Sequence, residues 1–237
     1  MQDEQQNAAA KATASPPERP LVVAIDGPAG AGKSTVARGL AAALGLRFLD
    51  TGAMYRAITL LAIEAGIAPS DGAALTALTE SLELDFDQDG RVVVAQRCLE
   101  PAIRRGDVTG HVSEVSAHPG VRAAVVARQQ EFGRRWDGLV AEGRDTTTVV
   151  FPDASHRFYL DASPAERARR RALELGVPEE VARIQAEIEL RDGKDSGRKH
   201  SPLVHGAGVE LVQTDGLEAG GVIEALLELV RGGGVEP

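Results

Sequence analysis

The fold is decided by the stretch Gly27-Pro28-Ala29-Gly30-Ala31-Gly32-Lys33-Ser34-Thr35, which fits the pattern G-x-x-x-x-G-K-[ST] at every fixed position. The apolar run Leu21–Ile25 precedes it and is short enough for a buried strand, and residues 36–44 follow it with helical spacing. Strand, glycine-rich loop and helix, in this order, form the context that the motif requires. The stretch therefore predicts a phosphate-binding loop at the start of an α/β fold.

Each part of this loop has an expected task. The glycines allow the backbone N–H groups to turn inward around a polyphosphate, and the helix that begins near Lys33 adds its positive dipole end. We expect Lys33 to reach the β- and γ-phosphates of ATP and the Ser34 hydroxyl to hold Mg²⁺. The ATP-binding residues that we expect here are Gly27, Pro28, Ala29, Gly30, Ala31, Gly32, Lys33, Ser34 and Thr35. The alternative is a glycine-rich turn without a ligand.

Composition limits the partners of this chain. Among 237 residues, 43% are hydrophobic, which is ordinary for a globular protein, and the formal net charge is −9. This charge argues against nucleic acid or an anionic membrane as the main partner. Cys98 is the single cysteine, so no disulfide framework is expected, a reducing cytoplasm fits, and the residue itself is expected to be a small buried hydrophobe. No apolar run approaches the roughly 18 residues of a membrane span, and we expect a cytoplasmic monomer.

Two further patterns predict strand ends that face a ligand. The run Arg47–Leu49 ends at Asp50-Thr51-Gly52, and the helix expected over residues 53–65 carries Tyr55 and Arg56 in its first turn. A solvated surface position is the alternative for Arg56. Farther along, the strand expected over Leu139–Ala141 ends at Glu142-Gly143-Arg144-Asp145.

The carboxylates of that last segment suggest a metal-supporting acid. In a P-loop protein the phosphate loop opens on the carboxyl edge of the sheet, where such an acid belongs. Glu142 and Asp145 both compete for this role on local sequence alone. A helix N-cap is the alternative for Asp145.

The segment over residues 69–116 differs in its hydrophobic pattern from the residues around it. Leu82–Phe86 and Arg91–Val94 are β-rich runs joined by Asp87-Gln88-Asp89-Gly90, which predicts an antiparallel hairpin. We expect an inserted unit that covers a substrate.

The chain after residue 150 supplies cations. A strand over 157–160 leads to Ser163-Pro164-Ala165-Glu166, a strong helix start with an N-cap, an N1 proline and a capping-box glutamate. A second helix is expected over 178–190, followed by a mobile loop from Arg191 to Pro202 that is dense in Arg and Lys. Such a loop suits closure over phosphates, because an acidic protein must supply this charge locally; a solvated linker is the alternative.

With a last strand over 209–212 and a helix over 220–230, these elements predict an α/β P-loop NTPase fold of three layers around a central parallel five-stranded sheet. The expected division of the chain is a disordered tail over 1–20, a P-loop core over 21–68 and 117–231, an insertion over 69–116, a mobile lid over 191–203 within the core, and a flexible tail over 232–237.

Four blocks of this sequence resemble the bacterial cytidylate kinases, which are P-loop nucleoside monophosphate kinases. The blocks are Ile25–Ser34, Leu49–Arg56, Glu142–Asp145 continued by Thr148–Ala154, and Arg191–Asp192 continued through Asp195-Ser196 and Arg198 to Leu203. The resemblance covers nearly all of residues 21–230. It implies transfer of the γ-phosphoryl group of ATP to CMP or dCMP in the presence of Mg²⁺. By the same resemblance, residues 21–68 and 117–231 would form a kinase core and residues 69–116 the CMP-binding insertion.

The resemblance also implies residue roles. Arg56 and Arg144 would hold the acceptor phosphate, and Tyr55 and Asp195 would lie near the acceptor ribose. The cytosine edge would be read by Ser113, Arg122 and Asp145, assisted by Thr51. Arg191 and Arg198 would close over the transferring phosphoryl group, and Arg170 would lie near the adenine of ATP. The expected catalytic set is Lys33, Arg144, Arg191 and Arg198, and the expected metal site is Ser34 with Glu142.

This sequence departs from the family pattern in two places. Thr146-Thr147-Thr148 stands where Met-Gly-Thr is usual, and Val94–Cys98 continues the second strand of the hairpin where a turn of the Gly-Glu-Asp type is common. The rival interpretations are a P-loop kinase for another small acceptor and a regulatory module that binds a nucleotide without turnover.

Overall fold

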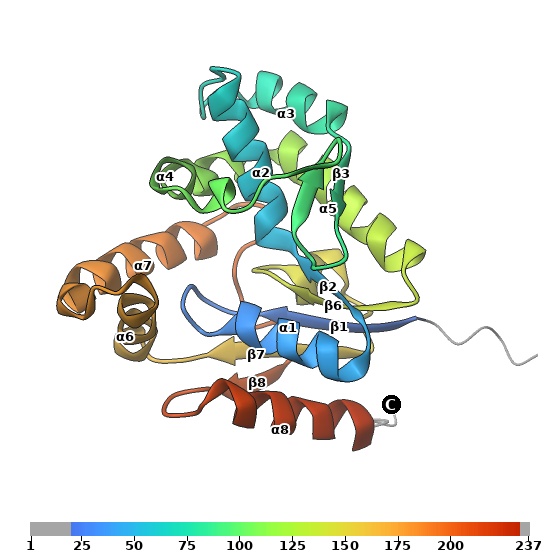
Figure 1. The fold of residues 1–237 in the computed structure, drawn as a ribbon, viewed down its shortest axis with the longest axis vertical. Coiled ribbons are helices and arrows are strands. Elements are labelled where there is room, and N and C mark those ends of the chain that lie inside the picture. The colour runs from blue at the N-terminus through green and yellow to red at the C-terminus, as the bar shows by residue number, and fades with distance from the viewer. Residues whose placement is uncertain (1–19, 233–237) are drawn as a thin grey trace, which may run out of the picture.

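The structure, a computed structural model, describes residues 20–232. Its centre is a five-stranded sheet in the order β2-β6-β1-β7-β8, in which every neighbouring pair is parallel (Figure 1). The strands are β1 (Leu21–Asp26), β2 (Arg47–Asp50), β6 (Gly138–Glu142), β7 (His156–Asp161) and β8 (Glu210–Gln213). This arrangement confirms the expected α/β fold with a parallel five-stranded sheet.

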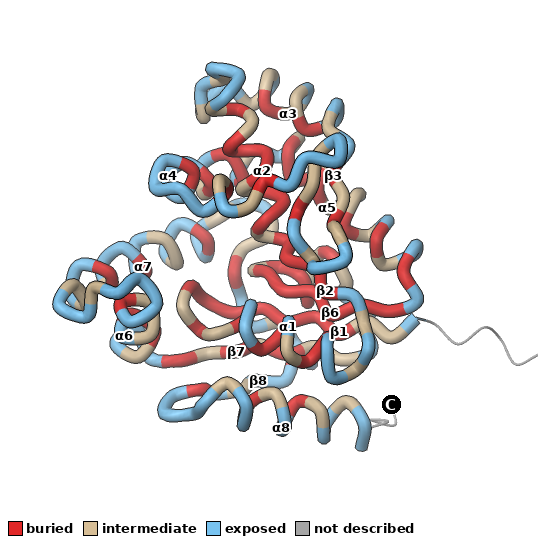
Figure 2. Tube along the Cα trace, in the orientation of Figure 1, coloured by how far each residue is buried: buried red, intermediate tan, exposed pale blue. Residues whose placement is uncertain are grey.

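Helices cover both faces of this sheet because successive strand side chains point to opposite sides. Val23, Ile25 and Val140 pack with α1 (Lys33–Leu44) and α8 (Ala219–Gly232) on one face. Leu49, Leu139 and Ala141 pack with α2 (Thr51–Glu64) and α5 (Pro119–Arg135) on the other. The central strands are consequently buried between the helical layers (Figure 2).

The insertion contains more strand pairing than the sequence suggests. It holds α3 (Gly72–Ser81), β3 (Leu84–Phe86), β4 (Val92–Val94), β5 (Arg97–Cys98), a 3-10 turn η1 (Ala102–Arg104) and α4 (Gly106–Val115). Continuation of the second strand through Val94–Cys98 was a wrong expectation: the chain turns at Ala95 and Gln96, whose φ angles are 46° and 65°, and β5 pairs back onto β4. The sequence hides this turn because neither residue is a glycine or asparagine. Cys98 is exposed on β5, contrary to the expected burial.

Two helices beyond β7 form a hairpin. They are α6 (Pro164–Leu175) and α7 (Val181–Ser196), joined through the 3-10 turn η3 (Pro178–Glu180). Their facing alanines and isoleucines form a small apolar cluster of their own.

Helix α7 corrects the boundary expected at Leu190. The helix continues through Gly193, and the N–H of Gly197 donates to the Gly193 carbonyl at 2.9 Å. Residues 191–196 are therefore helical rather than part of a loop. Arg191 and Asp195 lie one helical turn apart in this segment, where a pair of opposite charges supports a helix.

The expected tails over 1–20 and 232–237 lie outside the described residues, apart from Pro20 and Gly232. No helix within residues 20–232 is long and apolar enough to cross a membrane.

Candidate active site

The candidate site lies at the carboxyl edge of the parallel sheet. Strands β1, β2 and β6 end there in Asp26, Asp50 and Glu142, and β1 continues directly into the glycine-rich loop. Because these strands are parallel, their carboxyl ends meet on one side of the molecule, as the sequence predicts.

The loop over residues 27–32, called the P-loop below, has a backbone that only glycine tolerates in places. Gly27 has a φ of 147°, and a Cβ there would lie 2.0 Å from the Leu160 carbonyl oxygen. Gly32 has a φ of 84° and immediately precedes α1. The first N–H groups of a helix lack intrahelical acceptors, so the start of α1 offers donors and a positive dipole end to an anion. Ser34 and Thr35 are exposed at this end.

Lys33 and Glu142 are a buried pair of opposite charges beside the loop. The Lys33 ammonium donates to the Pro28 carbonyl at 2.8 Å. Burial lowers the pKa of Lys33, helped by the nearby charge of Arg144. Burial likewise raises the pKa of Glu142, and the neighbouring Asp50 raises it further. Both shifts show that these groups are withdrawn from water, which strengthens their interaction with any charged ligand.

The residues at this point fit a magnesium ion. Ser34 and Asp50 both lie close enough to Glu142 to act on the pKa of its carboxylate. Hydroxyl and carboxylate oxygens are hard donors, which Mg²⁺ prefers. Within residues 20–232 no group of three or more His, Cys, Asp or Glu could enclose a metal ion. This sparse donor set is typical of Mg²⁺, which keeps waters and takes oxygens from substrate phosphates.

A cluster of arginines surrounds Asp195 across from the P-loop. Arg144 donates from Nε to Asp195 Oδ2 at 3.0 Å and from Nη1 to the Gly27 carbonyl at 2.9 Å. Arg198 also pairs with Asp195, and the Nε of Arg191 lies 4.0 Å from the same carboxylate. Although burial opposes ionisation, the charges of Arg144 and Arg198 hold the pKa of Asp195 below its ordinary value. One carboxylate facing three guanidinium groups leaves a net positive region that suits an anion.

Arg191 and Arg56 extend this positive region. Burial, together with the charge of Arg144, lowers the pKa of Arg191 to about 10. Arg56 in α2 donates to the Ile103 carbonyl at 3.3 Å and to the Thr109 hydroxyl at 2.9 Å. Burial and the neighbouring Arg104 lower the pKa of Arg56 to about 10. Both guanidinium groups stay charged near neutral pH, at the junction of the core and the insertion.

A second polar cluster lies deeper, between α5 and the segment after β6. Arg122 forms a buried ion pair with Asp145, and its Nη1 donates to the Ser116 carbonyl at 3.1 Å. The guanidinium also lies over the Tyr55 ring, 5.3 Å from its centre. The Tyr55 hydroxyl and the Arg122 Nε are buried without hydrogen-bond partners among the described residues. Buried donors of this kind are usually satisfied by a ligand or an ordered water.

The structure locates the other predicted residues as follows. The Thr51 hydroxyl donates to the Glu142 carbonyl at 2.6 Å and so ties α2 to β6. Ser113 is half-buried in α4, and its carbonyl accepts a hydrogen bond from the Ser116 hydroxyl. Arg170 in α6 contacts Glu166 and Thr214 and lies near Gly32 of the P-loop. Asp145 precedes the short π-helical segment η2 (Thr146–Val150) but makes no side-chain cap, because its carboxylate is committed to Arg122.

Asp26 is a site residue that the sequence did not reveal. Its fully buried carboxylate accepts hydrogen bonds from the N–H and hydroxyl groups of both Thr146 and Thr147, at 2.6–2.8 Å. The departure from Met-Gly at these two positions was the available signal. The two threonines tie the start of the P-loop to the segment that carries Arg144 and Asp145.

Comparison with known proteins identifies relatives of this chain. A profile of the family described as Cytidylate kinase matches residues 23–232. A bifunctional pantoate ligase/cytidylate kinase of Synechococcus sp. (strain WH7803) is 50% identical over 222 residues, which cover 90% of this chain and 45% of that protein. The corresponding protein of Prochlorococcus marinus (strain MIT 9303) is 48% identical over 221 residues, again 90% of this chain and 45% of that protein. The chain thus spans about half the length of the curated relatives that it matches.

Among solved structures, an uncharacterised protein from Eubacterium ventriosum superposes with a TM-score of 0.51 at 8% identity, covering 90% of this chain and 99% of that one. This likeness concerns the fold alone. The profile match extends over the P-loop, the insertion and the arginine cluster together, and on that basis the chain belongs to the cytidylate kinase family.

Proposed function

We propose that this protein transfers the γ-phosphoryl group of ATP to CMP or dCMP, giving ADP and CDP or dCDP. The observation that carries the proposal is the position of the Asp195 cluster. Its arginines lie between the P-loop, which Arg144 contacts at Gly27, and the insertion, which Arg198 contacts at Ser116. A transferring phosphoryl group belongs at such a meeting point of donor and acceptor halves.

The donor half consists of the P-loop and its neighbours. Backbone N–H groups at the start of α1 and the Lys33 ammonium bind the ATP phosphates, and Arg170 lies toward the adenine. Ser34 and Glu142 hold Mg²⁺, which when bound neutralises charge on the β- and γ-phosphates. The burial of Lys33 excludes water from the point where its charge acts.

The acceptor half positions the monophosphate. Arg56 and Arg144 bind its phosphate oxygens, since a planar guanidinium can bind two oxygens at once. Arg122 and Asp145 read the cytosine edge with Ser113 and Thr51, and Tyr55 and Asp195 lie near the ribose. Arg191 and Arg198 cover the phosphoryl group during its transfer. Such a site needs positioning and positive charge more than a strong base.

An acceptor panel tests the proposal. ADP release from ATP and Mg²⁺ is followed by a coupled assay with CMP, dCMP, UMP and AMP at matched concentrations. We expect release to depend on the acceptor and to be fastest with CMP or dCMP. Faster release with AMP or UMP would favour a P-loop kinase for another acceptor. ADP release at a rate that does not depend on the acceptor, or nucleotide binding without ADP release, would favour a regulatory module.

We further infer that this protein is an enzyme of pyrimidine metabolism and that it acts in the cytoplasm, where its proposed nucleotide substrates are found. We also infer that it acts as a monomer. Light scattering checks the last point against the chain mass of 24.9 kDa. The curated relatives carry pantoate ligase in their names as well, and this chain covers less than half of their length, so that second activity belongs to those proteins.

A further inference from the structure

Ala29 of the P-loop is held from three sides by the hairpin of α6 and α7. Its N–H donates to Asp192 Oδ1 at 3.0 Å, and its carbonyl accepts from Arg167 Nη1 at 2.9 Å. Its methyl group packs into the apolar cluster of the hairpin with Ala168, Ala172, Ile184 and Ile188. The Ala29 N–H therefore points toward α7 and is occupied by a carboxylate rather than being free for a phosphate.

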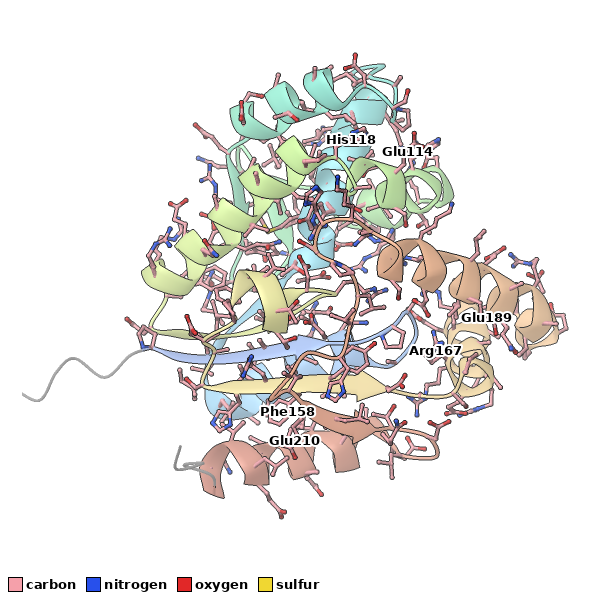
Figure 3. All side chains as sticks on the ribbon, turned by 180° about the vertical axis from the view of Figure 1, so that it is seen from behind. Glu114, His118, Phe158, Arg167, Glu189 and Glu210 are labelled. Carbon is pink, nitrogen blue, oxygen red and sulfur yellow. The ribbon has the colours of Figure 1, made fainter. Side chains whose placement is uncertain are left out.

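Arg167 and Asp192 complete this contact between themselves. The two side chains form an ion pair across the hairpin, and Arg167 Nε donates to the Ala162 carbonyl at 3.0 Å. The Arg167 side chain is only 7% exposed and the Asp192 side chain 15% exposed. Figure 3 shows Arg167 on α6 beside the loop that follows β1. Burial makes the ion pair costly to break, because removal of either side chain would leave the other as a buried charge without a counter-ion.

The backbone of the P-loop packs tightly against α6. A Cβ at Gly30 would lie 2.9 Å from the Arg167 carbonyl oxygen and 3.0 Å from its Cβ. The P-loop at residues 29 and 30 therefore rests directly on the start of α6.

Helix α7 carries two sets of contacts on different sides. Arg191 and Asp195, one turn apart, belong to the phosphate-binding cluster. Asp192 follows Arg191 and is rotated from it by about 100° around the helix, which turns it toward Ala29. One turn of α7 thus contacts the P-loop through Asp192 and the Asp195 cluster through Arg191.

We propose that Arg167 and Asp192 are positioning residues that fix the P-loop relative to Arg191 of α7 and the Asp195 cluster. The inference rests on the proposed function in that the P-loop and Arg191 serve the same phosphoryl group. Asp192 carries no phosphate itself, and its charge near an anion site is offset by Arg167, with Lys33 and Arg191 as the other cations within reach. Loss of the Arg167–Asp192 ion pair loosens the P-loop and weakens the binding of ATP and ADP. The residues proposed to read the pyrimidine keep their positions.

The test compares Asp192→Ala, Asp192→Asn and Arg167→Met. Affinity for ADP is measured by calorimetry, which needs no acceptor, and KM is measured for ATP and for CMP. We expect Asp192→Ala and Arg167→Met to weaken ADP binding and to raise KM for ATP by about tenfold or more, since each loses a charged hydrogen bond. Asp192→Asn retains an oxygen for the Ala29 N–H, so we expect a change of only about threefold. KM for CMP should change by less than about twofold in all three.

Two exposed residues of the same helices provide the controls. Glu189 on α7, labelled in Figure 3, hydrogen-bonds only to Gln185 in the same helix among the described residues, and Arg169 on α6 pairs with Glu166. Glu189→Gln and Arg169→Met should leave ADP affinity unchanged.

Equal increases of KM for ATP and CMP, or unchanged ADP affinity in a folded Asp192→Ala protein, would overturn the positioning role. Wild-type protein that binds ADP but does not phosphorylate CMP would overturn the proposed function alone, and the ADP comparison would still decide the role of the pair. Wild-type protein that does not bind ADP would overturn both.

Discussion

Arg144 at the end of β6 and Asp195 in the last turn of α7 form an ion pair, with 3.0 Å between Nε and Oδ2, although 51 residues separate them in the chain. Arg144 also donates to the Gly27 carbonyl, and Asp195 also holds Arg198. The pair thereby joins the P-loop, the carboxyl edge of the sheet and the segment proposed to cover the phosphoryl group. Each charged side chain needs the other as its counter-ion, because both are largely buried.

Replacement of Arg144 should separate acceptor use from donor affinity. We expect Arg144→Ala to raise KM for CMP by about tenfold or more, since it removes a charge-assisted contact to the acceptor phosphate, and to change ADP affinity by less than about threefold. Steady-state kinetics and calorimetry measure the two quantities. Arg134→Ala, an exposed change in α5, serves as the control. An equal loss of both would show that Arg144 mainly supports the P-loop through Gly27.

Replacement of Asp145 should affect both stability and the choice of base. Asp145→Ala leaves Arg122 as an unpaired buried cation, which we expect to lower the free energy of unfolding by about 3–5 kcal/mol. Asp145→Asn, which keeps an acceptor for Arg122, should fold better and still lose preference for CMP over UMP. Urea unfolding and the ratio of kcat/KM values give the measurements, with Arg128→Gln on the exposed face of α5 as the control. A stable Asp145→Asn protein with unchanged preference would contradict its role in reading the base.

Replacement of Lys33 should cost much more in turnover than in folding. Lys33→Met keeps the buried stem and removes the charge, so we expect kcat to fall by about 100-fold or more. The folded state loses one hydrogen bond to the Pro28 carbonyl, which is worth about 1 kcal/mol. ADP-release assays and thermal unfolding provide the two readouts. A variant that does not fold would show that the charge of Lys33 is needed for structure.

The hydrogen bonds around Asp26 should contribute to stability and to acceptor binding. Thr147→Val preserves shape but removes a hydroxyl donor to the buried carboxylate, and we expect a loss of about 1.5–3 kcal/mol in unfolding free energy. KM for CMP should rise as well, because Arg144 and Asp145 lie just before this segment. Thr148→Val, at a half-buried neighbouring position, is the matched control. Equal stability of the two variants would contradict the role of the threonine pair.

The charge of Glu166 should stabilise the start of α6 in a pH-dependent way. Hydrogen bonds from Arg169, and then from Arg170, lower the pKa of Glu166 to about 2 from an ordinary value of 4.5. A lowered carboxylate pKa stabilises the folded protein above pH 4.5, and this contribution is lost as the pH falls through about 2. The melting temperature of Glu166→Gln should therefore lie below that of the wild type at pH 7, and the gap should narrow between pH 4.5 and pH 3. A gap that stays constant over this range would show that the charge is not responsible.

Local patterns foresaw most of the fold. The P-loop motif located the junction of β1 and α1, because its glycines fill positions that a side chain would block, such as Gly27 against Leu160. Runs of apolar residues located the five core strands to within about two residues, since a buried strand needs only a short hydrophobic stretch. The turn at Ala95 and Gln96 escaped because neither residue is of a type that usually marks a turn. The extent of α7 escaped because Gly193 lies inside the helix, which ends only before Gly197.

The sequence by itself determined the residue types of the site: the phosphate loop with Lys33 and Ser34, the acid that ends β6, and the arginines on α2, after β6, and in and after α7. Only the tertiary structure decided how they pair. Asp195 gathers Arg144 and Arg198, Asp26 binds Thr146 and Thr147, and Asp192 with Arg167 holds Ala29. The physical reason is that periodicity and turn chemistry encode local backbone geometry. A contact across more than 100 residues, such as that of Asp192 with Ala29, depends on how whole helices and strands pack in space.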